Sequence, residues 1–111
     1  MEPHRSWIAP AILRALGQIG DARAIPSIRP LLKDWQPEVR LEAAKALGRL
    51  GDKESFDAIA EKASAISGGG QVGYLEALHA IDAERARPLI EKALRESLRD
   101  DLRNRLENLL K

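Results

Sequence analysis

The stretch Leu16-Gly17-Gln18-Ile19-Gly20-Asp21 returns in closely similar form as Leu47-Gly48-Arg49-Leu50-Gly51-Asp52, 31 residues further along the chain. A repeat period of about 20–50 residues is typical of stacked helix pairs, because a single pair cannot bury its apolar face alone. The repeated stretch therefore predicts an array of helical hairpins. It also suggests that any binding specificity lies in the residues that differ between repeats.

Helix signals surround the second copy. Pro37 suits the first turn of a helix, Gly51 suits a left-handed turn at its end, and Asp52 suits the cap of the next helix. Apolar residues recur at spacings of 3 and 4 between these signals, which predicts one buried helix face: Val39, Ala43, Ala46, Leu47 and Leu50. The following helix is expected to bury Phe56, Ile59, Ala63 and Ile66.

The first unit follows the same plan around the turn Gly20-Asp21. Its first helix is expected to bury Ile8, Ile12, Ala15, Leu16 and Ile19, and its second helix Ile25, Ile28 and Leu32. Gly17 and Gly48 stand inside the predicted helices, where glycine costs about 1 kcal/mol relative to alanine. We expect them to mark places where two helices cross closely.

The third unit departs from the pattern. Its second helix matches the first unit at twice the period, but its turn, Ile81-Asp82-Ala83, has no glycine, and His79 occupies the place of the in-helix glycine. Ser67-Gly68-Gly69-Gly70 before it is expected to be a linker or hinge. A last apolar stripe predicts a terminal half-repeat: Leu102, Leu106, Leu109 and Leu110.

We therefore predict an all-α fold, a right-handed α-α superhelix of three helical hairpins plus a C-terminal half-repeat. Residues 1–111 are expected to form one domain, with repeats at about 5–35, 36–67 and 68–98 and a terminal helix at 99–111. The chain resembles the HEAT-like repeat of phycobilisome lyases, an armadillo-like α-solenoid. The resemblance lies in Pro37-Glu38-Val39-Arg40, Ala43-Ala44, Ala46-Leu47-Gly48, Leu50-Gly51-Asp52 and Ala24-Ile25-Pro26.

That resemblance implies a fold more strongly than a function, because the family includes bilin lyases, enzyme subunits and adaptors. One branch, the deoxyhypusine hydroxylases, binds iron through His-Glu pairs. Here His4 precedes Arg5 and His79 precedes Ala80, so the pairs are missing. We accordingly expect no chemistry of its own, with no catalytic residue, metal or cofactor. A bilin lyase or isomerase component that binds a tetrapyrrole remains the enzymatic alternative.

The composition indicates which kinds of partner the chain can bind. Lys and Arg number 18 against 17 Asp and Glu, so the usual electrostatic argument for nucleic-acid binding is missing. There is no cysteine, no apolar run of membrane-spanning length and no signal-peptide pattern, so a cytoplasmic location is the default expectation. We predict a protein-interaction scaffold, adaptor or regulatory subunit that presents a concave surface. Nucleic-acid binding is the third alternative.

The second helices of such hairpins are expected to line the concave surface. Their outward positions mix charge signs, which favours a protein partner over a nucleic acid. The predicted contacts are Pro30, Glu61, Leu89, Lys92 and Arg95. Leu89 is expected either to anchor a partner or to pack within the fold. Trp35, in the turn between repeats, either contacts a partner or folds back onto Leu32.

Two further expectations concern contacts between units. Arg40 and Arg103 occupy equivalent positions and are expected to bind carboxylates or turn carbonyls of a neighbouring repeat, with Asp21 and Asp52 as natural partners. The first helix shows no polar capping face. Either the chain belongs to a longer array, or its N-terminal face self-associates through Trp7, Ile8 and Ile12.

Overall fold

The computed structural model describes residues 10–96 and 99–111 and is helical throughout this part, without a β-strand. The elements in order are α1 (Pro10–Ile19), η1 (Ala22–Ala24), α2 (Ile25–Ile28), η2 (Arg29–Lys33), α3 (Pro37–Arg49), η3 (Lys53–Ser55), α4 (Phe56–Ala65), α5 (Gly69–Ile81), α6 (Ala83–Arg95) and α7 (Asp100–Leu109). The elements labelled η are short 3-10 helices. This order confirms the predicted all-α solenoid of helical hairpins followed by a single helix.

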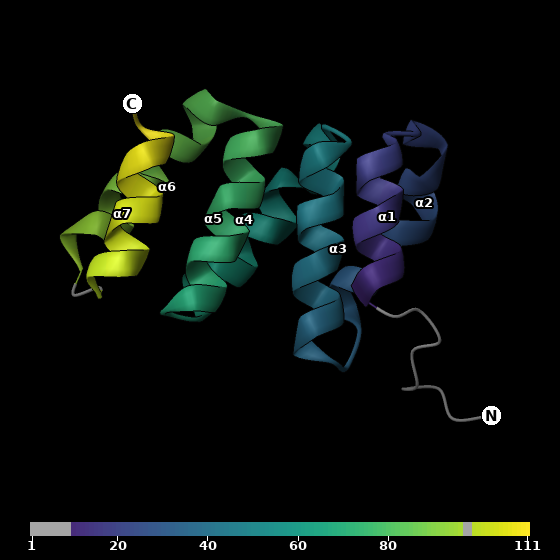
Figure 1. The fold of residues 1–111 in the computed structure, drawn as a ribbon, viewed down its shortest axis with the longest axis horizontal. Coiled ribbons are helices and arrows are strands. Elements are labelled where there is room, and N and C mark those ends of the chain that lie inside the picture. Colours follow the sequence, from purple (N-terminus) through teal and green to yellow (C-terminus); the bar gives the residue numbers. More distant parts are fainter. Residues whose placement is uncertain (1–9, 97–98) are drawn as a thin grey trace.

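The helices form two layers. The first-helix layer consists of α1, α3, α5 and α7, which stand side by side along the length of the molecule (Figure 1). The second-helix layer consists of α2 with η1 and η2, then α4, then α6; within it η2 packs against α3, and α4 packs against α5. The first-helix layer packs tightly, because α3 contacts both α1 and α5 over most of its length.

The turns within the hairpins form as the repeated motif predicts. Gly20 and Gly51 have φ angles of 78° and 70°, in the left-handed region that glycine adopts without strain. In the third hairpin Asp82 takes an extended conformation and its side chain accepts a hydrogen bond from the Arg85 backbone N–H at 3.2 Å. A side-chain cap thus replaces the glycine turn at this position.

In the first hairpin, part of the predicted core is exposed. Ile12 and Ile19 are 50% and 72% exposed, whereas Leu13 is completely buried. The predicted buried stripe was wrong for Ile12, Ala15 and Ile19, because the described residues cover α1 only on the face that carries Leu13 and Gly17. Ile8 lies outside the described residues.

The second helix of this hairpin is broken into α2 and η2. Pro30 has no N–H to continue the α-helical hydrogen bonds, and the chain tightens into a 3-10 helix from Arg29. The predicted core residues Ile28 and Leu32 are nevertheless buried. The apolar spacing therefore predicted burial correctly, although the helix is irregular.

Two predictions around the start of the third hairpin were wrong. Ile66 is 43% exposed, because α4 ends at Ala65 and Ile66 takes an extended conformation there. Gly69 and Gly70 belong to the first turn of α5 and are not a linker, while Gly68, with a φ angle of 77°, makes the sharp turn before the helix. The glycines therefore allow a short connection between the end of α4 and the start of α5.

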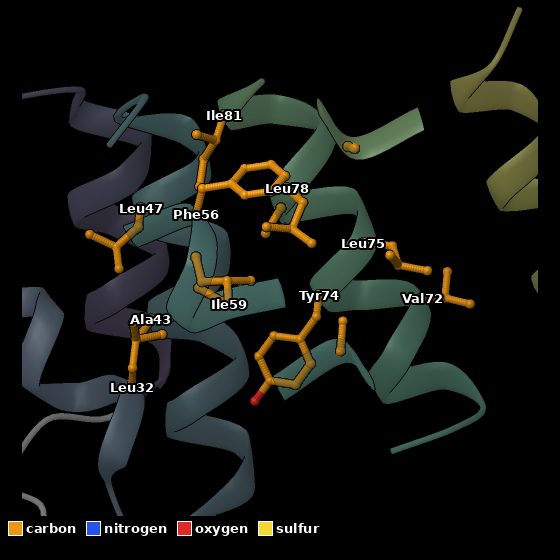
Figure 2. Close-up of a cluster of buried hydrophobic side chains, with 14 of the residues drawn as sticks. Leu32, Ala43, Leu47, Phe56, Ile59, Val72, Tyr74, Leu75, Leu78 and Ile81 are labelled. Atoms are coloured by element: carbon orange, nitrogen blue, oxygen red, sulfur yellow. The ribbon is translucent and has the colours of Figure 1, made fainter. Parts of the chain in front are cut away.

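The hydrophobic core lies between the two layers. Figure 2 shows its central part, where Phe56 and Ile59 of α4 meet Leu78 and Ile81 of α5 beside Leu47 of α3. At the C-terminal end, Leu102 and Leu106 of α7 are buried against the preceding hairpin. The predicted apolar stripe of the terminal helix therefore covers the C-terminal end of the core.

Candidate docking grooves

Two open cavities meet along α4. The η2–α4 groove, of about 490 Å³, lies between neighbouring members of the second-helix layer. The edge groove, of about 560 Å³, lies where the first turns of α3 and α5 approach the end of α4. Lys62 and Ala65 of α4 line both cavities, so the two grooves adjoin. A smaller cavity of about 130 Å³, the α4–α6 pocket, opens on the other side of α4.

Apolar side chains line most of the edge groove: Leu41, Ala65, Ile66 and Tyr74, with Pro37 and Gly70 between them. Leu41 lies directly over α5, because a Cβ placed on Gly73 would stand 2.8 Å from its Cδ1 atom. The Tyr74 ring belongs to the buried cluster and its hydroxyl oxygen lies at the edge of that cluster (Figure 2). Burial raises the pKa of the Tyr74 hydroxyl above its usual value, with Arg40 opposing the shift.

Arg40 connects this groove to the turn between the first two hairpins. Its Nη1 atom donates hydrogen bonds to the carbonyl oxygens of Asp34 at 2.8 Å and Trp35 at 3.2 Å. Arg103 does the same in the last helix, donating to the Leu94 carbonyl at 3.0 Å. Both arginines therefore bind turn carbonyls, as expected, and the suggested carboxylate partners were wrong for this pair.

Lys62 carries an unbalanced positive charge between the grooves. Its side chain is half-buried, and burial lowers the pKa of its ammonium group. Repulsion from Arg40 and Lys33 lowers it further, while Glu61 opposes the shift. Within the described residues none of these three cations forms an ion pair. The junction of the grooves is therefore a place where a negative group would be stabilised.

Arg29 lines the η2–α4 groove and is held in place there by the buried carboxylate of Asp52. Arg29 donates from Nε to Asp52 Oδ2 at 2.8 Å and from Nη2 to Oδ1 at 2.7 Å, a bidentate pair that joins the first two hairpins. Ser55 Oγ donates to the same carboxylate at 2.5 Å, and Glu54 lies 3.0 Å from Arg29. These contacts raise the pKa of Arg29 and lower that of Asp52. Asp52 thus binds Arg29, while Asp21 binds Arg23.

The predicted contact residues do not form one site. Glu61 lines the η2–α4 groove, whereas Leu89 and Lys92 line the α4–α6 pocket. Leu89 is half-buried against the core, and Trp35 is 58% exposed and does not fold into its own repeat. Exposed residues that line neither groove are Pro30 and Arg95.

The self-association candidates are only partly described. Ile12 is exposed on α1, and Trp7 and Ile8 lie outside the described residues. The role of this face in self-association therefore stays a prediction.

Sequence reasoning missed Lys62, Tyr74, Leu41 and Arg29 as groove residues. Each lies in a different helix or hairpin, and the grooves arise only when neighbouring hairpins stack. No spacing within a single repeat could have indicated this combination. The only signal was the aligned outward row of the second helices, which identified Glu61.

Across residues 10–96 and 99–111 no three His, Cys, Asp or Glu side chains gather closely enough to hold a metal ion. His79, the one histidine in this part, is half-buried on α5. The side chains described here therefore do not fit an iron site built from His-Glu pairs. No helix in the same residues is both long and apolar enough to cross a bilayer.

Comparison with protein families identifies the type of repeat. The family described as HEAT repeats matches residues 6–65, more than half of the chain. The chain belongs to the HEAT-repeat family. The match extends over the first two hairpins, which carry the repeated glycine-aspartate motif. It does not distinguish the phycobilisome-lyase type of repeat, which stays unconfirmed.

Two curated relatives are similar over part of the chain. Deoxyhypusine hydroxylase-B of Oryza sativa subsp. japonica is 49% identical over 49 residues, which is 42% of this chain and 16% of the relative. Deoxyhypusine hydroxylase of Homo sapiens is 45% identical over 51 residues, 44% of this chain and 17% of the relative. The chain thus spans about one sixth of the relatives it matches. No solved structure gave a significant match.

These relatives correct one prediction. The sequence led us to expect a protein without chemistry of its own, and the absence of His-Glu pairs led us to set the hydroxylase branch aside. Relatives at 45–49% identity are named for an enzyme, so the prediction of a non-enzyme was wrong. The His-Glu pairs were the wrong criterion, because a stretch of 49–51 residues can be shared with a relative without the residues that hold a metal.

Proposed function

We propose that this HEAT-repeat chain is a scaffold that docks a segment of a protein partner along α4, in the η2–α4 groove and the adjoining edge groove. One observation carries the proposal: the η2–α4 groove and the edge groove adjoin at Lys62 and Ala65 and together offer an elongated surface. The surrounding helices are held by core packing and by the Arg29–Asp52 pair. A rigid surface of this kind binds without a large ordering cost.

The charge pattern of the groove favours a protein over a nucleic acid. Arg29 and Lys33 alternate with Glu54 and Glu61 along the η2–α4 groove. A phosphate backbone requires one sign of charge along its whole track. Mixed signs suit a polypeptide segment, which carries both.

Cross-linking from defined positions tests this function. A photo-reactive amino acid at position 58 faces the η2–α4 groove, whereas the same group at position 80 lies in the first-helix layer, and both native residues are exposed alanines. In the source cell, position 58 is expected to capture a defined protein partner and position 80 is not. Equal capture at both positions, or capture of nucleic acid at position 58, would contradict the proposal.

A second candidate function rests on the relatives. We propose as the alternative that the chain supplies a helical-repeat part of a deoxyhypusine-hydroxylase-like enzyme, supported by the 45–49% identity over two-fifths of its length. Its described side chains do not fit the metal, so its contribution would be helical scaffolding. The test is a mass increase of one oxygen atom in a deoxyhypusine-bearing protein incubated with the purified chain, iron, dioxygen and a reductant, in which one atom of dioxygen enters the substrate and the other is reduced to water. No oxidation of the substrate would exclude activity of the chain by itself.

The bilin-lyase alternative has no support among the relatives. It stays a prediction, and an absorbance change of a free bilin on mixing with the protein tests it.

A further inference from the structure

We propose that the edge groove binds a partner segment in which an apolar side chain neighbours an acidic one. In this arrangement the apolar side chain packs against Leu41, Ile66 and Tyr74, and the carboxylate meets Lys62 beside Arg40. The inference rests on the proposed docking function and specifies the chemistry of the partner. The residues that line this groove are not part of the repeated glycine-aspartate motif of the HEAT repeats.

The apolar part of the groove is preformed. Leu41 is fixed against the α5 backbone at Gly73, and Tyr74 is anchored in the core with only 5% of its surface exposed. Ile66, in contrast, exposes 43% of its surface although it is a large hydrophobic residue. Burial of such a side chain by a partner removes apolar surface from water, and the rigid neighbours keep the ordering cost low.

The charged part of the groove attracts a carboxylate. Lys62 is half-buried with Arg40 and Lys33 close enough to lower the pKa of its ammonium group. Within the part of the chain that the structure describes, no carboxylate forms an ion pair with it. An incoming carboxylate therefore gains from Lys62 and Arg40, which line this groove, and from Lys33 in the adjoining one.

The acidic residues near the groove limit the ligand to a small number of negative charges. Glu38 lies in the first turn of α3, where the helix dipole compensates its charge, and it lines the edge groove. Glu61 lines only the neighbouring η2–α4 groove. A polyanion would have to pass both carboxylates, whereas one acidic side chain reaches Lys62 without doing so. This arrangement favours a peptide over a phosphate backbone.

Trp35 extends the same surface. Arg40 lines the edge groove and also holds the carbonyl oxygen of Trp35 at 3.2 Å, which places the exposed tryptophan turn next to the groove. An exposed indole offers a large rigid contact area for a bound segment. We therefore expect a peptide in the edge groove to change the environment of Trp35.

A randomised peptide library tests the inference. Displayed peptides of about 12 residues are selected on the full chain, and the selected peptides are measured against variants. Peptides with Asp or Glu within a few positions of Leu, Ile, Phe or Trp are expected to be enriched. Lys62→Glu is expected to weaken them by about tenfold or more. Lys62→Met, which keeps the apolar stem, and Ala65→Trp, which fills the groove, are expected to weaken them similarly.

The controls separate charge from fold. Lys53→Glu makes the same change on an exposed lysine that lines neither groove, and it is expected to leave the affinity within about twofold. A selected peptide whose acidic residue is changed to Lys is expected to regain affinity for the Lys62→Glu chain. Helical circular dichroism and thermal midpoints of all variants show that they are folded.

Three outcomes overturn the inference. Selected peptides without an acidic residue, or peptides insensitive to both Lys62→Glu and Ala65→Trp, show that the edge groove is not the acidic-apolar site. A selection with no enriched peptide overturns it as well. In each case cross-linking from position 58 still reports whether the docking function itself holds.

Discussion

Gly48 in α3 lies directly against Ala77 in α5: a Cβ at position 48 would stand 2.9 Å from the Ala77 carbonyl oxygen and 3.2 Å from its Cα. The same relationship recurs one repeat earlier, where a Cβ on Gly17 would stand 3.1 Å from the Ala46 Cα. The pairs Gly17–Ala46 and Gly48–Ala77 are therefore the points at which the first helices approach most closely. Both residues of the contact recur after 31 residues, so each hairpin packs on the next through the same glycine and alanine positions.

The Gly48–Ala77 contact predicts that Gly48→Ala destabilises the fold. Alanine would gain about 1 kcal/mol as a better helix former. Its methyl group would, however, meet α5 backbone that must shift, and overpacking of this kind costs about 1–3 kcal/mol. We expect a net loss of about 1 kcal/mol in the free energy of unfolding, measured by urea denaturation.

Gly17→Ala is the matched control for Gly48→Ala. Its Cβ would meet Ala46 at 3.1 Å and the flexible Arg49 side chain at the same distance, and α1 is covered on one side only in the described residues. We expect this change to be neutral within about 0.5 kcal/mol. A Gly17→Ala loss as large as that of Gly48→Ala would show that the α3–α5 crossing is not the tighter one.

The Arg29–Asp52 pair predicts a cost for Asp52→Asn. The carboxylate is 5% exposed and accepts three hydrogen bonds, two from Arg29 and one from Ser55. Its neutral analogue weakens the charged bonds, so the free energy of unfolding is expected to fall by about 1–3 kcal/mol. Glu54→Gln, at the exposed second partner of Arg29, is expected to cost less than about 0.5 kcal/mol. Equal losses in the two variants would contradict the assignment.

The same pair predicts an acid-sensitive component of stability. The Arg29 guanidinium lowers the pKa of Asp52 below its ordinary 3.8, so the folded chain binds this proton less readily than the unfolded chain. The stabilisation is therefore complete above pH 3.8 and is lost as the pH falls through the lower folded value. The difference in unfolding free energy between the native chain and Asp52→Asn is expected to shrink below about pH 4. A difference that stays constant down to pH 2 would contradict this mechanism.

The sequence predicted the scaffold well, for a physical reason. Glycine turns and apolar spacing are local, so Gly20, Gly51 and the stripe around Leu47 could be predicted from each hairpin separately. The errors fall where neighbours decide the outcome. Ile12 and Ile19 have the spacing of buried residues, but the described residues offer them no neighbour. Ile66 follows the spacing of α4, but the helix ends one residue earlier.

The candidate site was predicted much less well. The groove lining joins Leu41 of α3, Lys62 of α4 and Tyr74 of α5, three residues from three helices that meet only after stacking. Trp35 was predictable because an exposed tryptophan in a short turn is unusual by itself. Lys62 carried no signal in the sequence, since its position between Arg40 and Lys33 depends on the packing of two hairpins.

Tyr74 predicts a spectroscopic signature of the edge groove. It is the single tyrosine of the chain, and burial raises the pKa of its hydroxyl above the ordinary 10.0. The absorbance of tyrosinate is therefore expected to appear at a higher pH in the folded protein than in free tyrosine, and the fold is expected to lose stability as the pH rises above 10.0. Titration at the ordinary pKa in a chain that is still helical would show that Tyr74 is not buried. A bound groove peptide is expected to move the transition further upward.

The exposed apolar face of α1 predicts self-association of this HEAT-repeat chain. Ile12 and Ile19 expose 50% and 72% of their surfaces, and we propose that a second copy covers them together with Trp7 and Ile8. Light scattering is expected to give a mass that rises with protein concentration, and the double variant Ile12→Lys, Ile19→Lys is expected to stay monomeric. Exposed Gln18→Lys on the same helix is the control, since it also introduces a lysine but leaves Ile12 and Ile19 in place. A monomer mass of the native chain at every concentration would exclude this assembly.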